Sequence, residues 1–140
     1  MKENQSNPLL GELKITNSYL AANQLYDELH DLDHEESWVL FLTSANTPIL
    51  KKMMTCGTLS AAPLDSRRIV KEAILCDAAG VILFHNHPSG DCHPGTADIT
   101  GTEKLRQCCE LFNISLLDHI IITAKNFFSF AEESSNTYKK

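Results

Sequence analysis

Apolar residues recur along this chain at spacings that separate helical segments from strands. In three segments they return every three or four residues, which places them on one face of a helix. The predicted starts, each at a residue able to cap a helix, are Ser18 for the first helix, Asp65 or Ser66 for the second, and Thr96 or Asp98 for the third. We expect the first helix to end between His30 and Asp33, and Gly80 to terminate the second.

Short, uninterrupted apolar runs predict buried strands between and after these helices. They span residues 38–42, 81–84, 120–122 and 127–128. A turn at Asn46-Thr47-Pro48 follows the first run, so we expect a hairpin whose second strand continues through Thr58. The alternation of helices and strands favours an α/β fold, in which a mixed sheet is flanked by helices.

Length and composition predict a single domain. With 140 residues, 43% of them hydrophobic, the chain can bury one sizeable core, whereas two independent domains would each fall below the usual size. We expect a flexible N-terminal segment at 1–14, a domain at 15–131 and a flexible tail at 132–140. The first thirty residues contain no uninterrupted apolar block, so we expect a soluble, cytoplasmic protein with no membrane partner.

Charge and cysteine content narrow the function further. The formal net charge of -6 repels phosphate backbones, so we expect no direct nucleic-acid binding. The five cysteines form an odd set without a C-x-x-C pair. That pattern argues against a disulfide framework and against a four-cysteine zinc ribbon.

The most informative segment follows the predicted strand at 81–84. His85 and His87 are two residues apart, so on a strand their side chains project from the same face and can converge on one ion. Pro88 ends the strand, and the loop after it can bring Asp98 back as a third ligand. Two nitrogens and one oxygen leave a fourth position for water, which is typical of a catalytic zinc site.

This segment resembles a known family. The pair His85-x-His87 with Asp98 eleven residues later resembles the JAMM motif of JAB/MPN metalloproteases, and the string HNHPSGD is similar to RadC proteins. Further segments resemble RadC proteins in the same order: 39–42, 56–59, Arg67, 117–121 and 128–130. The resemblance covers about residues 15–130 and implies a JAB/MPN fold of cytidine-deaminase-like architecture. It also implies a zinc-dependent hydrolase that cleaves an amide or isopeptide bond in a peptide or protein substrate.

The resemblance implies a catalytic glutamate on an earlier strand, which takes a proton from the attacking water and passes it to the leaving group. Glu35 matches best, because residues 35–42 resemble the RadC pattern E-x-F-x-V-L-x-L, and Glu36 is the alternative. Alternation along a strand places these two glutamates on opposite faces, so only one can face the metal. The JAMM pattern also has a serine where this chain has Gly95, and the loss of such a hydroxyl can cost about a hundredfold in rate.

Five further residues need an interpretation. Cys92 and His93 lie in the same loop, and we expect both to be exposed rather than to bind metal. Asp118 and His119 resemble the LLDH signature of RadC proteins, and we expect them to orient a metal ligand or to satisfy buried hydrogen bonds. His34 lies in an acidic stretch and is predicted to be a solvated surface residue.

Two other functions compete with hydrolysis. One is a RadC-type accessory protein of DNA repair or mobile elements that acts mainly as a binding module, although the acidic charge argues against direct duplex binding. The other is a zinc-dependent nucleobase deaminase. That class needs H-x-E and a later P-C-x-x-C, whereas the strand end of this chain carries His85-Asn86-His87 and the chain has no C-x-x-C. The sequence leaves the substrate and the oligomeric state open.

Overall fold

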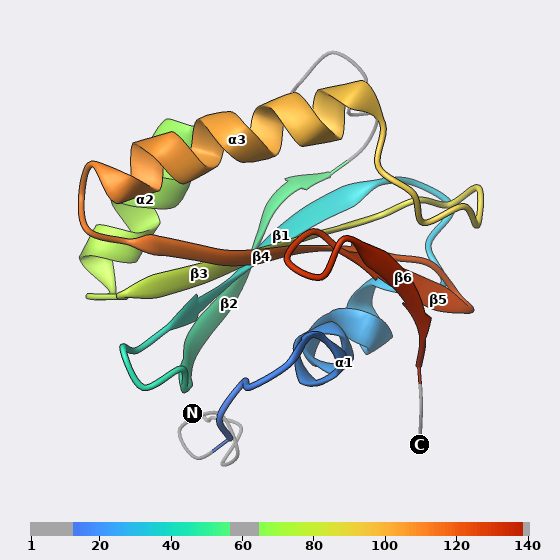
Figure 1. Cartoon of the computed structure of the whole chain (residues 1–140), viewed down its shortest axis with the longest axis horizontal. Coiled ribbons are helices and arrows are strands. Elements are labelled where there is room, and N and C mark those ends of the chain that lie inside the picture. The colour runs from blue at the N-terminus through green and yellow to red at the C-terminus, as the bar shows by residue number, and fades with distance from the viewer. Residues whose placement is uncertain (1–12, 57–64, 139–140) are drawn as a thin grey trace.

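The computed structural model describes residues 13–56 and 65–138, which form a mixed sheet with helices on both faces (Figure 1). The elements are α1 (Ser18–Leu29), β1 (Glu36–Leu42), β2 (Pro48–Cys56), α2 (Ser66–Leu75), β3 (Gly80–Asn86), α3 (Thr96–Glu110), β4 (Ser115–Ile122), β5 (Asn126–Ser129) and β6 (Ser134–Thr137). The six strands lie in the order β2-β1-β3-β4-β5-β6. Neighbouring strands are antiparallel except β3 and β4, which are parallel and are connected through α3. The predicted α/β class is confirmed.

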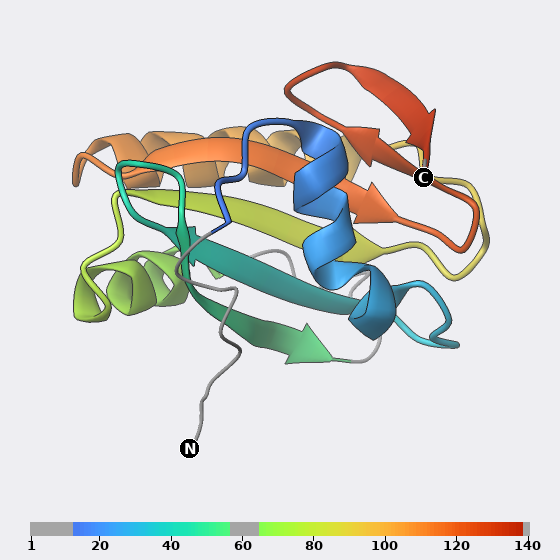
Figure 2. The ribbon, with the colours of Figure 1, turned by 90° about the horizontal axis from the view of Figure 1, so that it is seen from below.

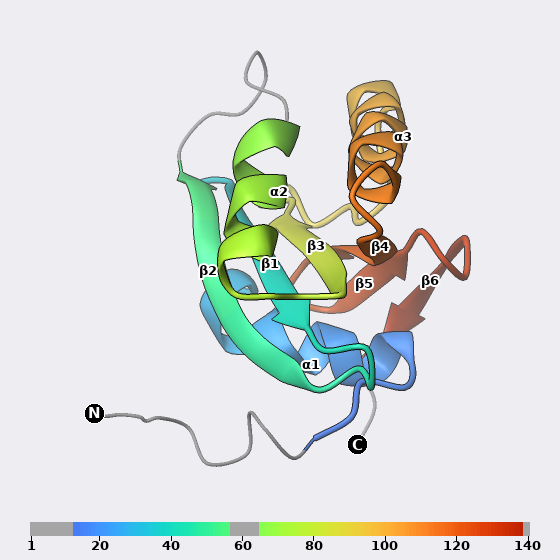
Figure 3. The same cartoon turned by 90° about the vertical axis from the view of Figure 1, so that its left-hand side faces the viewer.

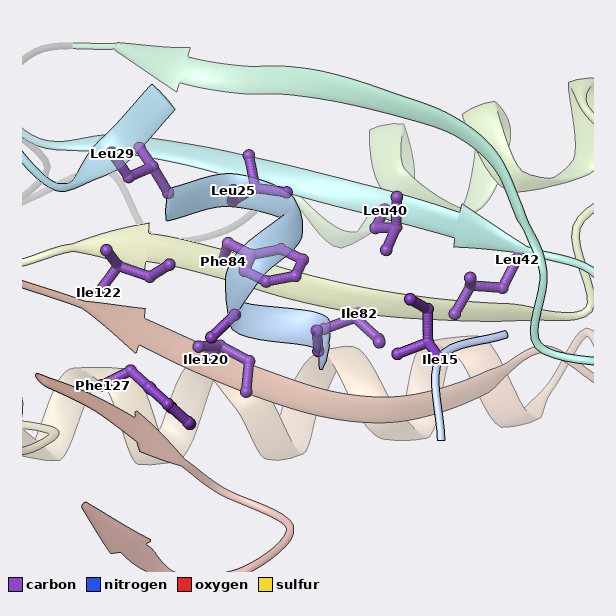
Figure 4. Packing of buried hydrophobic residues seen from close by; sticks show 12 residues of the cluster. Ile15, Leu25, Leu29, Leu40, Leu42, Ile82, Phe84, Ile120, Ile122 and Phe127 are labelled. Atoms are coloured by element: carbon purple, nitrogen blue, oxygen red, sulfur yellow. The ribbon is translucent and has the colours of Figure 1, made fainter. Parts of the chain in front are cut away.

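The sheet separates two hydrophobic cores. Helices α2 and α3 cover one face and α1 covers the other, as Figures 2 and 3 show from two directions. Alternation along β1 supplies both cores, because Val39 and Phe41 join the cluster under α2 and α3, while Leu40 joins the cluster under α1. In the α1-side cluster, Leu25 and Phe84 are fully buried (Figure 4). Burial of each such side chain stabilises the fold by about 1.5–3 kcal/mol, so the two central strands hold the site that follows β3 in place.

The first two helices begin at side chains that accept hydrogen bonds from free amides. Asn17 caps α1, accepting from the backbone N–H of Leu20 at 2.8 Å, so the prediction of Ser18 as the cap is wrong by one residue. Ser18 is instead the first helical residue. The prediction for the second helix is confirmed, because Asp65 caps α2.

The end of α2 comes earlier than predicted. Asp77 adopts a left-handed conformation with φ 59°, and the backbone N–H of Ala78 donates to the carbonyl of Ala73 at 2.8 Å. This pattern is a Schellman motif, which closes the helix without a glycine. Gly80 therefore does not terminate α2. It opens β3 at a crowded position, where a Cβ atom would lie 3.0 Å from the Cδ1 atom of Leu117.

The predicted flexible tail at 132–140 is wrong for its central part. Residues 134–137 form β6, which pairs antiparallel with β5. Tyr138 then packs against Phe127, with ring centroids 5.3 Å apart, and its hydroxyl donates to the carbonyl of Thr123 at 2.8 Å. The polar sequence Ser-Ser-Asn-Thr has no apolar pattern that would predict a strand. Backbone pairing at the edge of the sheet holds it in place instead.

Several predictions fall near or beyond the described part of the chain. Of the expected flexible segment at 1–14, the structure describes residues 13 and 14, and Leu13 packs against the α1-side cluster. The predicted continuation of the second strand through Thr58 lies outside the described residues, as do residues 57–59 of the RadC resemblance. None of the helices in the described part combines the length and the apolar character that a membrane span requires.

Candidate metal centre

The end of β3 carries two histidines on one face. In the antiparallel pairing of β1 with β3, His85 lies opposite Ser37, and both residues are buried. His87 follows one residue beyond the strand, and the two Nε2 atoms lie 3.0 Å apart. The i and i+2 spacing therefore brings both imidazoles to one point, as the alternation of side chains requires.

Asp98 reaches the histidines from the first turn of α3. Gly95 is the N-cap and Thr96 the first residue of this helix, so the predicted start at Thr96 is confirmed and the alternative at Asp98 lies two residues too late. The Oδ2 atom of Asp98 accepts from the Gly95 N–H at 2.9 Å, which holds the carboxylate at the helix end. Its Oδ1 and Oδ2 atoms lie 3.3 Å from His85 Nε2 and 3.5 Å from His87 Nε2. Each of the three residues offers a ligand atom within 4.8 Å of the other two.

Hydrogen bonds behind each histidine determine which ring nitrogen is free. The Nδ1 atom of His87 lies 2.8 Å from the backbone carbonyl of Asp91. A carbonyl can only accept, so Nδ1 carries the proton of the neutral ring. The Nε2 atom of His87 is left with a lone pair that faces Asp98.

For His85, a longer chain of hydrogen bonds determines that Nδ1 carries the proton and Nε2 the lone pair. The hydroxyl of Thr102 donates its one proton to the carbonyl of Asp98 at 2.6 Å, so it must accept from His119 Nδ1, also at 2.6 Å. Burial lowers the pKa of His119 well below its usual value, so that ring is neutral. Its Nε2 atom therefore accepts from His85 Nδ1 at 2.8 Å. The Nε2 atom of His85 keeps a lone pair toward the carboxylate.

Two lone pairs and a carboxylate converge at this point, and such an arrangement needs positive charge. Burial alone would raise the pKa of Asp98, but hydrogen bonds with His85 and His87 hold it well below its usual range. Burial alone would lower the pKa of His87, but its bonds to Asp98 and to the Asp91 carbonyl raise it. A shared proton can therefore occupy the site. Two imidazole nitrogens and a carboxylate oxygen are also the ligands of catalytic zinc sites, so the donor set fits zinc.

The two candidate glutamates stand at the start of β1, with Glu36 its first residue and Glu35 just before it. Glu36 faces away from the metal centre, with its Oε2 atom 2.8 Å from His34 Nε2. Glu35 precedes Ser37 by two residues, and the β1–β3 register extended to it places it opposite His87. The negative charge of Glu35 also contributes to the raised pKa of His87. The geometry thus brings Glu35 to the histidine side, while its catalytic role stays a prediction.

Gly95 occupies the position of the JAMM serine without crowding. Its φ of -88° is open to any residue, and a Cβ atom there would meet no atom closer than Asp98 Oδ2 at 3.8 Å. The backbone conformation and the free space at position 95 would therefore accommodate a serine side chain.

Sequence-based predictions were also made for four residues around the metal centre: Cys92, His93, Asp118 and His119. Cys92 is 2% exposed, so its predicted loop exposure is wrong, and burial raises the pKa of its thiol. His93 is exposed, as predicted. For the LLDH signature, two roles were predicted: orienting a metal ligand and satisfying buried hydrogen bonds. Each of its two polar residues takes one of these roles. His119 orients His85, whereas Asp118 accepts a hydrogen bond from Ser129 at 2.7 Å and holds β4 against β5.

Thr102 is a residue that sequence reasoning missed. It follows Asp98 by one helical turn, so the two residues lie on one face of α3. That spacing was the available signal, but the partner His119 is on β4, 17 residues away in the sequence. Its role depends on how α3 packs over the sheet.

Fold and site together define a class of protein. A mixed six-stranded sheet with three helices, and an H-x-H pair joined by an aspartate at the end of a central strand, is the α/β arrangement of a JAB/MPN domain. A family model described as a RadC-like JAB domain matches residues 15–135. The chain belongs to the RadC-like JAB domain family.

Similar proteins are found in several bacteria. A UPF0758 protein of Actinobacillus pleuropneumoniae serotype 5b is 41% identical over 119 residues, which cover 85% of this chain and 54% of that protein. A UPF0758 protein of Histophilus somni strain 2336 is 42% identical over 129 residues, covering 89% of this chain and 58% of that protein. One from Flavobacterium johnsoniae is 38% identical over 120 residues, covering 86% and 52%. The chain therefore spans about half the length of these relatives, and their name states no reaction.

Proposed function

We propose that this chain is a zinc-dependent hydrolase that cleaves an amide or isopeptide bond in a peptide or protein. The observation that carries the proposal is the convergence of two histidine Nε2 lone pairs and a carboxylate, with each histidine held in the metal-binding tautomer by its own partner. Zinc held by His85, His87 and Asp98 would lower the pKa of water and polarise a carbonyl group.

The residues of this chain would supply the remaining chemistry. Glu35, which the extended β1–β3 register directs to the histidine side, would take the proton of the attacking water and return it to the leaving amine. Thr102 and His119 would hold His85 in the tautomer whose Nε2 atom is free. The acidic net charge of -6 favours a peptide or protein substrate over a phosphate backbone.

Gly95 supports a competing function. Without the serine hydroxyl at this position, the oxyanion formed during acyl transfer lacks one donor. A domain that binds a partner and hydrolyses slowly or not at all, as an accessory protein of DNA repair or mobile elements would, is therefore the alternative. The two functions differ in whether a chemical step depends on Glu35.

Metal content of the purified protein tests the proposal first. We expect His85→Ala and Asp98→Ala to lose one equivalent of zinc relative to wild type, while His30→Ala, at the far end of α1, keeps it. Peptide and isopeptide substrates then follow, with Glu35→Gln measured beside Glu110→Gln, which changes an exposed glutamate on α3. Activity lost in Glu35→Gln with zinc retained supports the hydrolase. Zinc binding that is unchanged in both ligand variants contradicts it.

A further inference from the structure

A second group of metal-ligand atoms lies on the opposite side of β1 from the histidine pair. His34, Glu36 and Cys56 each offer one ligand atom within 4.8 Å of the other two. The His34 Nε2 atom lies 2.8 Å from Glu36 Oε2, and the Cys56 Sγ atom lies 3.8 Å from the same oxygen. Glu36 and Cys56 are direct partners in the antiparallel β1–β2 pairing, so their side chains leave the sheet on one face.

Neighbouring groups hold two of these ligands with their metal-binding atoms turned inward. Asp33 Oδ1 lies 2.9 Å from His34 Nδ1, which keeps a proton on Nδ1 and directs Nε2 toward Glu36. A carboxylate behind a histidine is the usual partner of a metal-ligating imidazole. The indole N–H of Trp38 donates to Glu36 Oε1 at 3.0 Å, which leaves Oε2 to face His34 and Cys56.

The backbone that carries these ligands is also fixed. The amide of the buried Asn86 side chain donates to the carbonyl of His34 at 2.8 Å, and its Oδ1 atom accepts from the N–H of Glu36, also at 2.8 Å. Both bonds tie the segment before β1 to the end of β3. These hydrogen bonds therefore hold the backbone of His34 and Glu36 in the position that brings their side chains together.

We propose that His34, Glu36 and Cys56 form a second zinc site. Imidazole nitrogen, carboxylate oxygen and thiolate sulfur are zinc ligands, and the thiolate disfavours magnesium and calcium. Metal would displace the proton on His34 Nε2 and the thiol proton of Cys56, so binding releases protons. Cys56 is exposed, which leaves a path for the ion.

The position of this site bears on the first one. Glu35 stands between His34 and Glu36 in the sequence, but the β1–β3 register extended by two residues beyond Ser37 directs its side chain to the histidine face. Metal bound by the two flanking residues would hold the backbone on both sides of Glu35. This prediction of His34 as a ligand replaces the sequence-based expectation that it is a solvated surface residue.

Cobalt binding tests the second site independently of the first. The starting protein is the whole chain with His85→Ala and Asp98→Ala, which removes the first site, stripped of metal with a chelator and titrated with Co²⁺. We expect saturation at about one equivalent, with a thiolate-to-cobalt charge-transfer band in the near ultraviolet. The His85, His87 and Asp98 set contains no sulfur and cannot produce that band.

Single substitutions in the same background identify the ligands. Cys56→Ser is expected to abolish the charge-transfer band and His34→Ala to weaken cobalt binding at least tenfold, whereas Cys76→Ser, a partly buried cysteine after α2, changes neither. Circular dichroism checks that each variant is folded. A protein that shows no band, or a band that survives Cys56→Ser, overturns the second site. Cobalt binding in wild type that is lost completely in His85→Ala supports the first site and also overturns the second.

Discussion

Replacing Thr102 with valine tests whether the hydrogen bonds behind His85 select its metal-binding nitrogen. Valine keeps the shape of threonine but can neither donate to the Asp98 carbonyl nor accept from His119. Without that acceptor, the neutral His119 ring is favoured with its proton on Nε2, where it can donate to His85 Nδ1. His85 would then carry its proton on Nε2, the atom that faces Asp98 and His87.

The expected loss of affinity follows from the role of this partner. Removing a group that orients a metal-ligating histidine weakens metal binding by about 10- to 100-fold, which corresponds to about 1.4–2.7 kcal/mol. The fold should also lose stability, because Thr102 is 3% exposed and each of its hydrogen bonds contributes about 1 kcal/mol. Zinc affinity is measured by competition with a chromophoric chelator, and stability by urea unfolding of the metal-free protein.

Thr123→Val is the matched control. Thr123 is also 3% exposed, and its hydroxyl donates to the carbonyl of Asn126 at 2.8 Å in the turn between β4 and β5. This variant should lose similar stability yet bind zinc as wild type does. If Thr102→Val loses stability but binds zinc within about twofold of wild type, the tautomer reasoning is refuted.

Three further predictions address the cap, the carboxylate and the core. Gly95→Ser should raise the rate of hydrolysis by about 10- to 100-fold, measured with peptide substrates. As a better N-cap, the serine should also stabilise the fold by a few tenths of a kcal/mol in urea unfolding. Lower activity than wild type would contradict the prediction. In metal-free protein, the lowered pKa of Asp98 means that its charged form stabilises the fold. Wild type should therefore have a larger free energy of unfolding than Asp98→Asn above the ordinary pKa of 3.8, and this difference should be lost as pH falls. Urea unfolding between about pH 6 and pH 3 checks this sign, and an advantage that grows in acid would be inconsistent with it. Leu25→Ala should cost about 2–5 kcal/mol in the same assay, because that side chain is fully buried under the sheet; Leu111→Ala, on a side chain 81% exposed, should stay within about 0.5 kcal/mol.

Much of the fold was predictable because the relevant signals are local. The apolar runs at 38–42 and 81–84 became β1 and β3, which are buried on both faces and therefore need no polar alternation. The pairing of β5 with β6 was not predictable in the same way. Residues 134–137 have no apolar face, and their strand exists because the edge of β5 offers backbone partners.

Those parts of the site that depend on strand geometry could be predicted from the amino-acid sequence. The spacing of His85 and His87 places both imidazoles on one face, and the alternation of β1 separates Glu35 from Glu36. Tertiary structure alone decided that Asp98 reaches those imidazoles and that Thr102 and His119 select the free nitrogen of His85. The physical reason is that backbone geometry fixes the direction of side chains close in sequence. Contacts between a loop, a helix and a distant strand depend instead on how the helix packs over the sheet.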